Sequence, residues 1–140
     1  MAVKEIVLVV KDTPGELARI VGHLYENDVQ VSAFWVGSAH EKATIRMVTS
    51  DPETAMSVLT GLGCKPGTKD VISVQVPDHP GGLNTILQLL RSARINILHI
   101  YPCLDTRDPT LILEVDNTNK AVKVLQENWI NLHDDSVYTL

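Results

Sequence analysis

The chain of 140 residues repeats itself. Residues 12–17, Asp-Thr-Pro-Gly-Glu-Leu, return 66 residues later as residues 78–83, Asp-His-Pro-Gly-Gly-Leu. The same shift, without a gap, superposes apolar positions along both halves: Ile20 on Ile86, Leu24 on Leu90, Ala55 on Ala121, Val58 on Val124 and Leu59 on Leu125. A period of this length is longer than one helix pair of a solenoid. The repeat therefore predicts two small domains of one fold, residues 1–66 and 67–140.

The composition favours a folded chain with an aliphatic core, because 44% of the residues are hydrophobic. The formal net charge of −5, with scattered basic residues, disfavours nucleic acid as a partner. No apolar run approaches the roughly 20 residues of a membrane span. The N-terminus lacks the pattern of a signal peptide. We therefore expect a cytoplasmic protein that does not bind membranes.

No motif for metal binding or catalysis stands out. Cys64 and Cys103 are single and do not correspond in the repeat, so we expect free thiols. The five histidines lack the spacing of a zinc set. The sequence offers no recognisable nucleophile with its base and no catalytic carboxylate pair. We predict no metal, no cofactor and no catalytic residue.

Hydrophobic periodicity gives the same order of elements in each half. Apolar residues at i, i+3, i+4 and i+7 predict amphipathic helices, whose buried stripes begin at Leu17 and Leu83. Runs of β-branched and alternating residues predict strands. These are first strands at 6–10 and 71–76, second strands at 29–36 and 95–102, and third strands at 43–49 and 110–115.

Closing strands complete the predicted pattern. Residues 136–140 are expected to close the second unit. The closing strand of the first unit is either short, around 65–70, or merged with the next unit's first strand. The order strand, helix, strand, strand, helix, strand predicts two α+β, ferredoxin-like βαββαβ units. We expect strands 29–36 and 95–102 to meet edge to edge, giving one joint antiparallel sheet with the helices on one face.

The repeated Pro-Gly turn admits a purely structural interpretation. Proline presets the backbone for a first helical turn, and glycine permits close approach of the chain. Asp12 and Asp78 would then accept hydrogen bonds from the first helical N–H groups. On this interpretation the loops only start the two helices.

The same turn suits a zwitterionic ligand. N–H groups at a helix N-terminus, near Gly15 and Gly81, attract a carboxylate, and an aspartate beside them accepts from an ammonium group. Gly82 replaces Glu16 in the second copy, which removes an anion that would compete with the ligand carboxylate. The second copy is therefore the better candidate, with Gly81 and Gly82 as carboxylate donors and Asp78 as the ammonium acceptor.

Residues 10–17 and 76–83, together with Arg-Ile-Asn-Ile at 94–97, carry a specific resemblance. The sequence resembles tandem ACT-domain proteins, whose pattern after the helix is Gly-Ile-Asn-Ile. ACT domains are regulatory modules of βαββαβ topology that bind amino acids in many metabolic enzymes. The resemblance covers both halves and extends to a stand-alone group that contains only two ACT domains.

The resemblance implies a ligand held across an interface between two ACT domains. In serine-binding members, the polar residue before the x-Pro-Gly turn and the Asn of the post-helix strand hold it, which places these roles on Asp78 and Asn96. The family histidine that helps to bind serine is replaced by Val10 and Val76. The implied ligand-binding set is Asp12, Gly15, Glu16, Gln30, Asp78, His79, Gly81, Gly82, Leu83 and Asn96.

The resemblance and the loop chemistry together imply a non-catalytic sensor. It binds a free amino acid at the junction of the two ACT domains and regulates amino-acid metabolism as a homodimer, with a metabolic enzyme as the possible partner. The alternative is a protein-docking module that regulates a partner enzyme without a ligand of its own.

Overall fold

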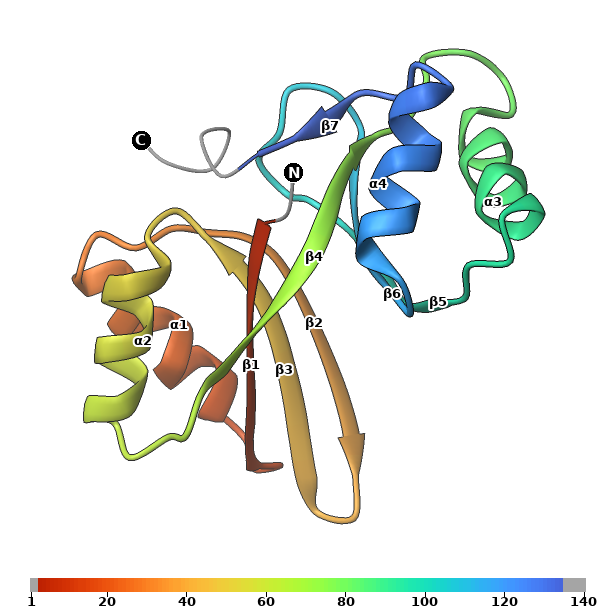
Figure 1. The fold of residues 1–140 in the computed structure, drawn as a ribbon. Helices are drawn as coiled ribbons and strands as arrows, with labels where there is room; N and C mark the ends of the chain where they lie inside the picture. Colours follow the sequence, from red (N-terminus) through yellow and green to blue (C-terminus); the bar gives the residue numbers. More distant parts are fainter. Residues whose placement is uncertain (1–2, 135–140) are drawn as a thin grey trace. The chain divides into compact units, whose positions relative to one another are not determined.

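The computed structural model describes residues 3–134 (Figure 1). These residues divide into two compact units, which we call the first unit, residues 4–69, and the second unit, residue 3 with residues 70–134. The elements of the first unit are β1 (Val3–Lys11), α1 (Glu16–Glu26), β2 (Val31–Ala39), β3 (Lys42–Thr49) and α2 (Pro52–Gly61). Strand β3 pairs antiparallel with both β1 and β2.

The second unit repeats this arrangement. Its elements are β4 (Gly67–Gln75), α3 (Gly82–Ser92), β5 (Ile97–Pro102), β6 (Thr110–Val115), α4 (Thr118–Glu127) and β7 (Leu132–His133). Strand β6 pairs antiparallel with both β4 and β5, and β7 pairs with β4. The predicted closing strand at 136–140 lies outside the described residues.

The repeat of 66 residues holds at the level of hydrogen-bond register. Ile6 lies opposite Met47 in the first unit, and Ile72 lies opposite Leu113 in the second. Both second strands carry a register shift at the same place, after Val31 and after Ile97. Helices α1 and α3 correspond residue for residue, as do α2 and α4.

Strand β4 joins the two halves of the chain without a linker. Residues 67–69 of this strand belong to the first unit, and its remaining residues belong to the second. Of the two alternatives for the closing strand of the first unit, the structure therefore has the merged one. The strand order is β2-β3-β1-β4-β6-β5. The predicted α+β fold, two βαββαβ units in a joint antiparallel sheet, is thus confirmed.

One detail of the predicted sheet is wrong. Strands β2 and β5, expected to meet edge to edge, stand at the two ends of the strand order. The cause is chain continuity. Because no turn interrupts β4, the strand that ends one unit extends directly into the strand that begins the next.

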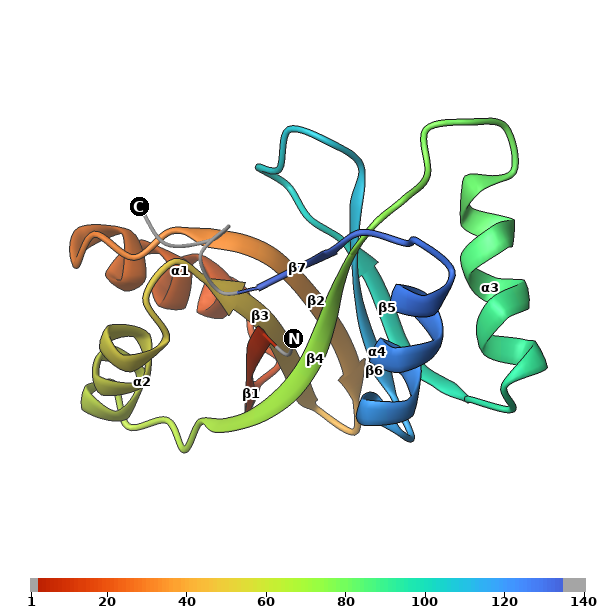
Figure 2. The same cartoon turned by 45° about the horizontal axis from the view of Figure 1, so that its top comes forward.

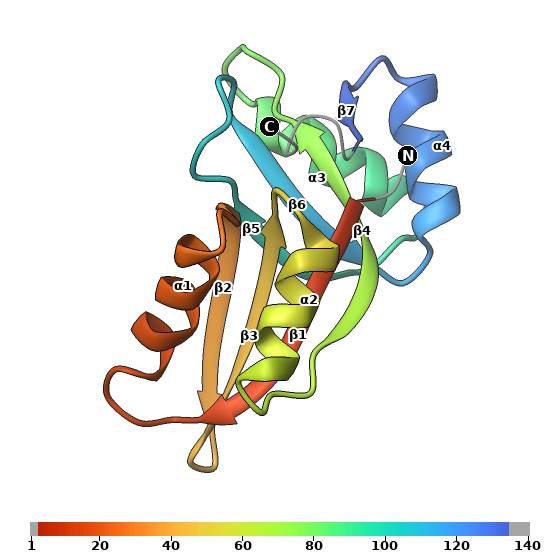
Figure 3. The same cartoon turned by 90° about the vertical axis from the view of Figure 1, so that its left-hand side faces the viewer.

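Each unit has its own core between its helices and one face of its strands. In the first unit, α1 lies beside α2 over that face, as Figure 3 shows. In the second unit, α3 lies beside α4 (Figure 2). Side chains with no exposed surface on the first helix of each pair, such as Ile20 and Ile86, face the strands at equivalent positions. Among the described helices, none is long and apolar enough to cross a membrane.

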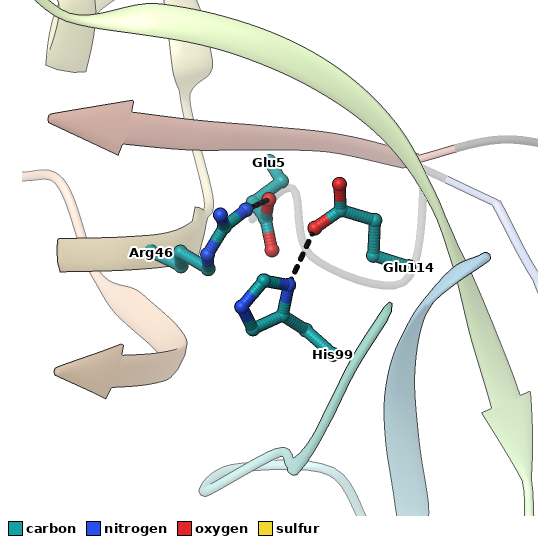
Figure 4. A network of polar contacts seen from close by, with 4 residues as sticks. All are labelled: Glu5, Arg46, His99 and Glu114. Atoms are coloured by element: carbon teal, nitrogen blue, oxygen red, sulfur yellow. Dashed lines mark hydrogen bonds and ion pairs between the residues drawn. The ribbon is translucent and has the colours of Figure 1, made fainter. Parts of the chain in front are cut away.

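Each unit also holds one polar pair on its strands (Figure 4). In the first unit, Arg46 donates to the fully buried Glu5 over 3.1 Å, and its guanidinium lies 5.9 Å from the centre of the Trp35 ring. In the second unit, Nδ1 of His99 donates to Glu114 over 2.9 Å. A buried charge of this kind requires its partner, because desolvation is costly.

The polar pairs are where the two copies differ most in chemistry. Val71 and Ile112 occupy the positions that correspond to the first unit's pair. Ala33 and Val48 occupy those that correspond to the second unit's pair. The same strand scaffold therefore accepts either an ion pair or an apolar pair at matched sites.

The matched sites allow a test in which the chain supplies its own replacements. We expect Glu5→Val alone, or Arg46→Ile alone, to lower the free energy of unfolding by about 3–5 kcal/mol, because each removes one partner of a buried ion pair. The double variant should lose clearly less than the sum of the two single losses. Urea denaturation of the four proteins measures this coupling, and strictly additive losses would contradict it.

The helix caps give a second test. Asp51 caps α2, accepting from the Thr54 amide over 3.1 Å and the Thr54 hydroxyl over 2.6 Å. The Thr54 hydroxyl, and then its amide, hold the pKa of Asp51 below the usual value. Asn117 caps α4 in the same way without a charge.

A lowered pKa in the folded state means that Asp51 adds stability above the pKa it has in the unfolded chain, about 3.9. This contribution is lost as the pH falls through the folded value. We expect Asp51→Asn to make the free energy of unfolding less dependent on pH between about pH 5 and pH 2. Denaturant titrations across this range measure it. An unchanged pH profile would show that the cap does not titrate as inferred.

Candidate ligand-binding site

The two Pro-Gly loops, residues 12–15 and 78–81, have the same backbone. Gly15 and Gly81 both have φ of 83°, in the left-handed region, and each directly precedes its helix. The left-handed conformation costs a residue with a side chain about 1–2 kcal/mol, so glycine is the residue that fits both positions. In the second loop, His79 N–H donates to the Pro77 carbonyl over 2.9 Å. The first loop has the equivalent bond, from Thr13 to Lys11, at 3.0 Å.

The structural interpretation of the two aspartates is wrong. The N-cap residues of α1 and α3 are Gly15 and Gly81, and in the described chain neither helix has a side-chain cap. Asp12 and Asp78 lie before these glycines and are exposed. The reason is that the left-handed glycine turns the chain between the aspartate and the helix. Both carboxylates are therefore left for another role.

One of the two predicted carboxylate donors of the second loop, the N–H of Gly82, is already engaged within the loop. The N–H of Gly82 donates to the His79 carbonyl over 3.0 Å, so it already has a partner. The next two N–H groups, of Leu83 and Asn84, have no hydrogen-bond acceptor among residues 3–134. The first N–H groups of a helix lack intrahelical partners. The start of α3 thus has unpartnered N–H groups at Leu83 and Asn84, which the sequence did not indicate as donors.

Gly82 also has a steric role that the sequence did not show. A Cβ atom at this position would lie 2.2 Å from the carbonyl oxygen of Pro77. The corresponding residue of the first unit is Glu16, which carries a full side chain and forms an ion pair with Arg19. The hydrogen bond from Arg19 to Glu16 raises the pKa of Arg19. The start of α1 therefore carries a paired anion where the start of α3 carries none.

Two further predicted residues of the second loop behave differently from expectation. The His79 ring donates from Nδ1 to the Pro80 carbonyl over 2.9 Å, so it is held against its own loop. Leu83, predicted to begin the buried stripe of its helix, is 45% exposed. The buried stripe of α3 begins instead at Gly82 and continues through Ile86 and Leu90. An exposed leucine consequently lies at the start of the helix, next to the free N–H groups.

The predicted polar residues after each first helix are fixed by their main chains. Asn96 donates its N–H to Oδ1 of Asp116 over 3.1 Å and accepts from the Asp116 N–H over 3.1 Å. Gln30 makes the equivalent pair of bonds with Ser50, each 2.9 Å long. Both residues are exposed. The main chain at these two positions is thus held in the same way in both units.

Asp78 and Asn96 are not brought together within the second unit. Asp78 lies before α3 and Asn96 follows it, and a helix of 11 residues is about 16 Å long. A free amino acid is too short to span that length. The structure therefore separates the two residues to which the family resemblance assigns one ligand.

Asn96 instead borders an open hollow of about 430 Å³ at the C-terminal end of α3. The hollow is lined by Leu87, Leu90, Arg91, Arg94, Ile95, Asn96 and Ile97. The sequence reasoning missed its two arginines. The signal that would have found them is the difference between the copies, because Tyr25 and Asp28 occupy the corresponding positions of the first unit.

The described part of the chain gives little basis for metal or thiol chemistry. Residues 3–134 contain no group of three His, Cys, Asp or Glu side chains arranged to hold a metal ion. Cys64 and Cys103 are free and half-buried.

A family model described as an ACT domain pair matches residues 1–139. Among curated protein sequences, none matches the chain. Among solved structures, protein BT0572 from Bacteroides thetaiotaomicron is 22% identical, with a TM-score of 0.90 over 100% of this chain and 98% of that one.

Two aspartate kinase subunits are also similar in structure. The ligand-free regulatory subunit of aspartate kinase from Thermus thermophilus is 16% identical, with a TM-score of 0.62 over 89% of this chain and 91% of that one. The regulatory subunit from Thermus flavus is 17% identical, with a TM-score of 0.57 over 90% and 92%. At these identities the likeness shows a shared fold.

The close contact at Gly82 predicts an asymmetry between the two loops. We expect Gly82→Ala to lower the free energy of unfolding by about 1–3 kcal/mol, because the Pro77 carbonyl must move away. The matched change in the first loop, Glu16→Ala, should cost less, since that position already holds a side chain. Thermal and urea denaturation measure both losses. Equal losses in the two variants would contradict the inferred backbone approach.

Proposed function

Because the chain belongs to the ACT domain pair family, we propose that it is a non-catalytic sensor that binds a free α-amino acid. The observation that carries the proposal is the start of α3. There the exposed Asp78 lies in the loop that leads into a helix whose Leu83 and Asn84 N–H groups have no acceptor among the described residues. Such N–H groups attract a carboxylate, and an aspartate attracts an ammonium group. A free α-amino acid carries both charges.

The second Pro-Gly loop is the stronger of the two candidates. At the start of α1, Glu16 places a carboxylate where the ligand carboxylate would bind, although Arg19 partly offsets its charge. At the start of α3, Gly82 places none. We propose that the first loop, with Asp12, Gly15 and Gln30, binds amino acids more weakly or not at all.

We propose further that the site needs two ACT domains to be complete. Asp78 and Asn96 lie at opposite ends of α3, so one ligand can contact both only if they come from different domains. This requirement supports the homodimer that the resemblance implies. The domain limits 1–66 and 67–140, and a cytoplasmic location, stay predictions.

A regulated enzyme is the proposed readout of binding. Regulatory subunits of aspartate kinase share this fold. We propose that ligand binding here likewise changes an interaction with an enzyme of amino-acid metabolism. The alternative, docking without a ligand, is favoured by the 45% exposure of Leu83, which offers an apolar contact at the same helix end.

The experiment that separates these functions is a melting screen with the twenty amino acids. A ligand at 100 times its dissociation constant adds about 2.7 kcal/mol to the stability of the protein, which raises the melting temperature measurably. Asp78→Ala should abolish the shift while leaving the ligand-free melting temperature near that of the parent protein, because this side chain caps no helix.

Asp12→Ala is the matched control and should weaken binding less than Asp78→Ala does. Calorimetric titration of both variants with the amino acid found in the screen gives the comparison. If none of the twenty amino acids shifts melting or releases heat at millimolar concentration, the sensor function is wrong and the docking function replaces it.

A further inference from the structure

The hollow at the C-terminal end of α3 combines an apolar floor with a cationic rim. Leu90 and Ile95 are buried, and Leu87 and Ile97 are half-buried, so they form the floor. Arg91, Arg94 and Asn96 are exposed and form the rim. The hollow contains no acidic side chain. This combination suits an anion that also has an apolar part.

The two arginines are available for an outside partner. Arg91 donates to the Gln88 side chain over 3.2 Å, which orients its guanidinium and leaves most of its five donors unused. Among residues 3–134, no hydrogen bond or ion pair holds the Arg94 side chain. The chain as a whole carries a formal charge of −5, so acidic residues that could have neutralised them are plentiful.

Arg94 stands at a position where a side chain is disfavoured. Its φ is 58°, in the left-handed region that closes the helix, and glycine is the usual residue there. For arginine this conformation costs about 1–2 kcal/mol. A cation near the C-terminal end of a helix is stabilising, but Arg91 in the last turn of α3 already supplies such a cation. Strain of this kind is frequent where a side chain is retained for a function.

The first unit provides the same floor with a different rim. Val21, Leu24, Val29 and Val31 occupy the floor positions, with the same burial. Tyr25 and Asp28 replace the two arginines. Aspartate adopts the left-handed conformation more readily than arginine does. The strained cation is therefore specific to the second unit and is not required by the fold.

We propose that this hollow binds a small aliphatic carboxylate that lacks an ammonium group, such as a short branched fatty acid or a 2-oxo acid. The carboxylate accepts from Arg91 and Arg94, whose planar guanidinium groups match its geometry. The aliphatic body covers Leu87, Leu90 and Ile95. An ammonium group would find two cations and no carboxylate in the lining. The hollow shares Asn96 with the proposed amino-acid site, but its two cations are Arg91 and Arg94, and Asp78 of the same unit lies at the opposite end of α3.

The test uses calorimetric titration of the full chain with 3-methylbutanoate and with 4-methyl-2-oxopentanoate. Leucine, which has the same aliphatic end and an added ammonium group, is the matched probe, and sodium chloride at equal ionic strength is the control for general anion binding. We expect both carboxylates to bind, and at least one of them about tenfold or more tightly than leucine at this site. Tighter binding of one carboxylate then distinguishes the fatty acid from the 2-oxo acid.

Variants that copy the first unit locate the site. Arg91→Tyr and Arg94→Asp should each weaken carboxylate binding about tenfold or more, since each removes a charge-assisted contact. Arg94→Gly should also weaken binding while raising the melting temperature or leaving it unchanged. This result would show that the loss of binding comes from the lost charge and not from a loss of folded structure. Asp78→Ala should not weaken this binding, because it removes an anion and no contact to the carboxylate.

Four results would overturn the proposal. The first is carboxylate affinity that is unaltered in Arg94→Asp. The second is chloride competing as well as 3-methylbutanoate, which would show a general anion site. The third is leucine binding here as tightly as its 2-oxo counterpart. The fourth is no carboxylate heat at all. A loss of binding in Asp78→Ala but not in Arg94→Asp would assign the carboxylate to the other end of the helix.

Discussion

The left-handed glycine that precedes α1 and α3 is the constraint on which the candidate site depends. With φ of 83°, Gly15 and Gly81 turn the chain from strand to helix in a single residue. The helix therefore starts without a side chain over its end, and the preceding aspartate is left outside it. The α2 and α4 helices, capped by Asp51 and Asn117, show the opposite arrangement on the same chain. Among the described helices, α2 and α4 therefore have a side-chain cap at the N-terminus, and α1 and α3 have none.

The predictable part of this structure is the part that the repeat and the hydrophobic period encode. Strand β6 matched its expected residues, and β3 differed by one residue. The exposure of Leu83 was missed because periodicity does not register that a tight glycine start shifts the buried stripe to Gly82. The prediction that strands 29–36 and 95–102 meet edge to edge was wrong for a similar reason. A repeat does not indicate whether a closing strand continues into the next unit.

The site was harder to predict than the fold, because it depends on hydrogen bonds within a few residues. The N–H of Gly82, predicted as a carboxylate donor, donates to the His79 carbonyl, and no residue pattern reveals this bond. The cationic rim at Arg91 and Arg94 was visible only as a departure of one copy from the other. Comparing charges between copies, rather than matching what they share, is the more informative operation on a duplicated sequence.

The continuity of β4 has a consequence for how chains of this kind can grow. Residues 67–69 finish one unit and the rest of the strand starts the next, with a period that contains no gap. A further copy of 66 residues inserted inside β4 would regenerate both the ending and the beginning of that strand. No new turn would be required, and no side chain would move to the other face of the sheet. Duplication can thus lengthen such a chain in whole units through one internal junction.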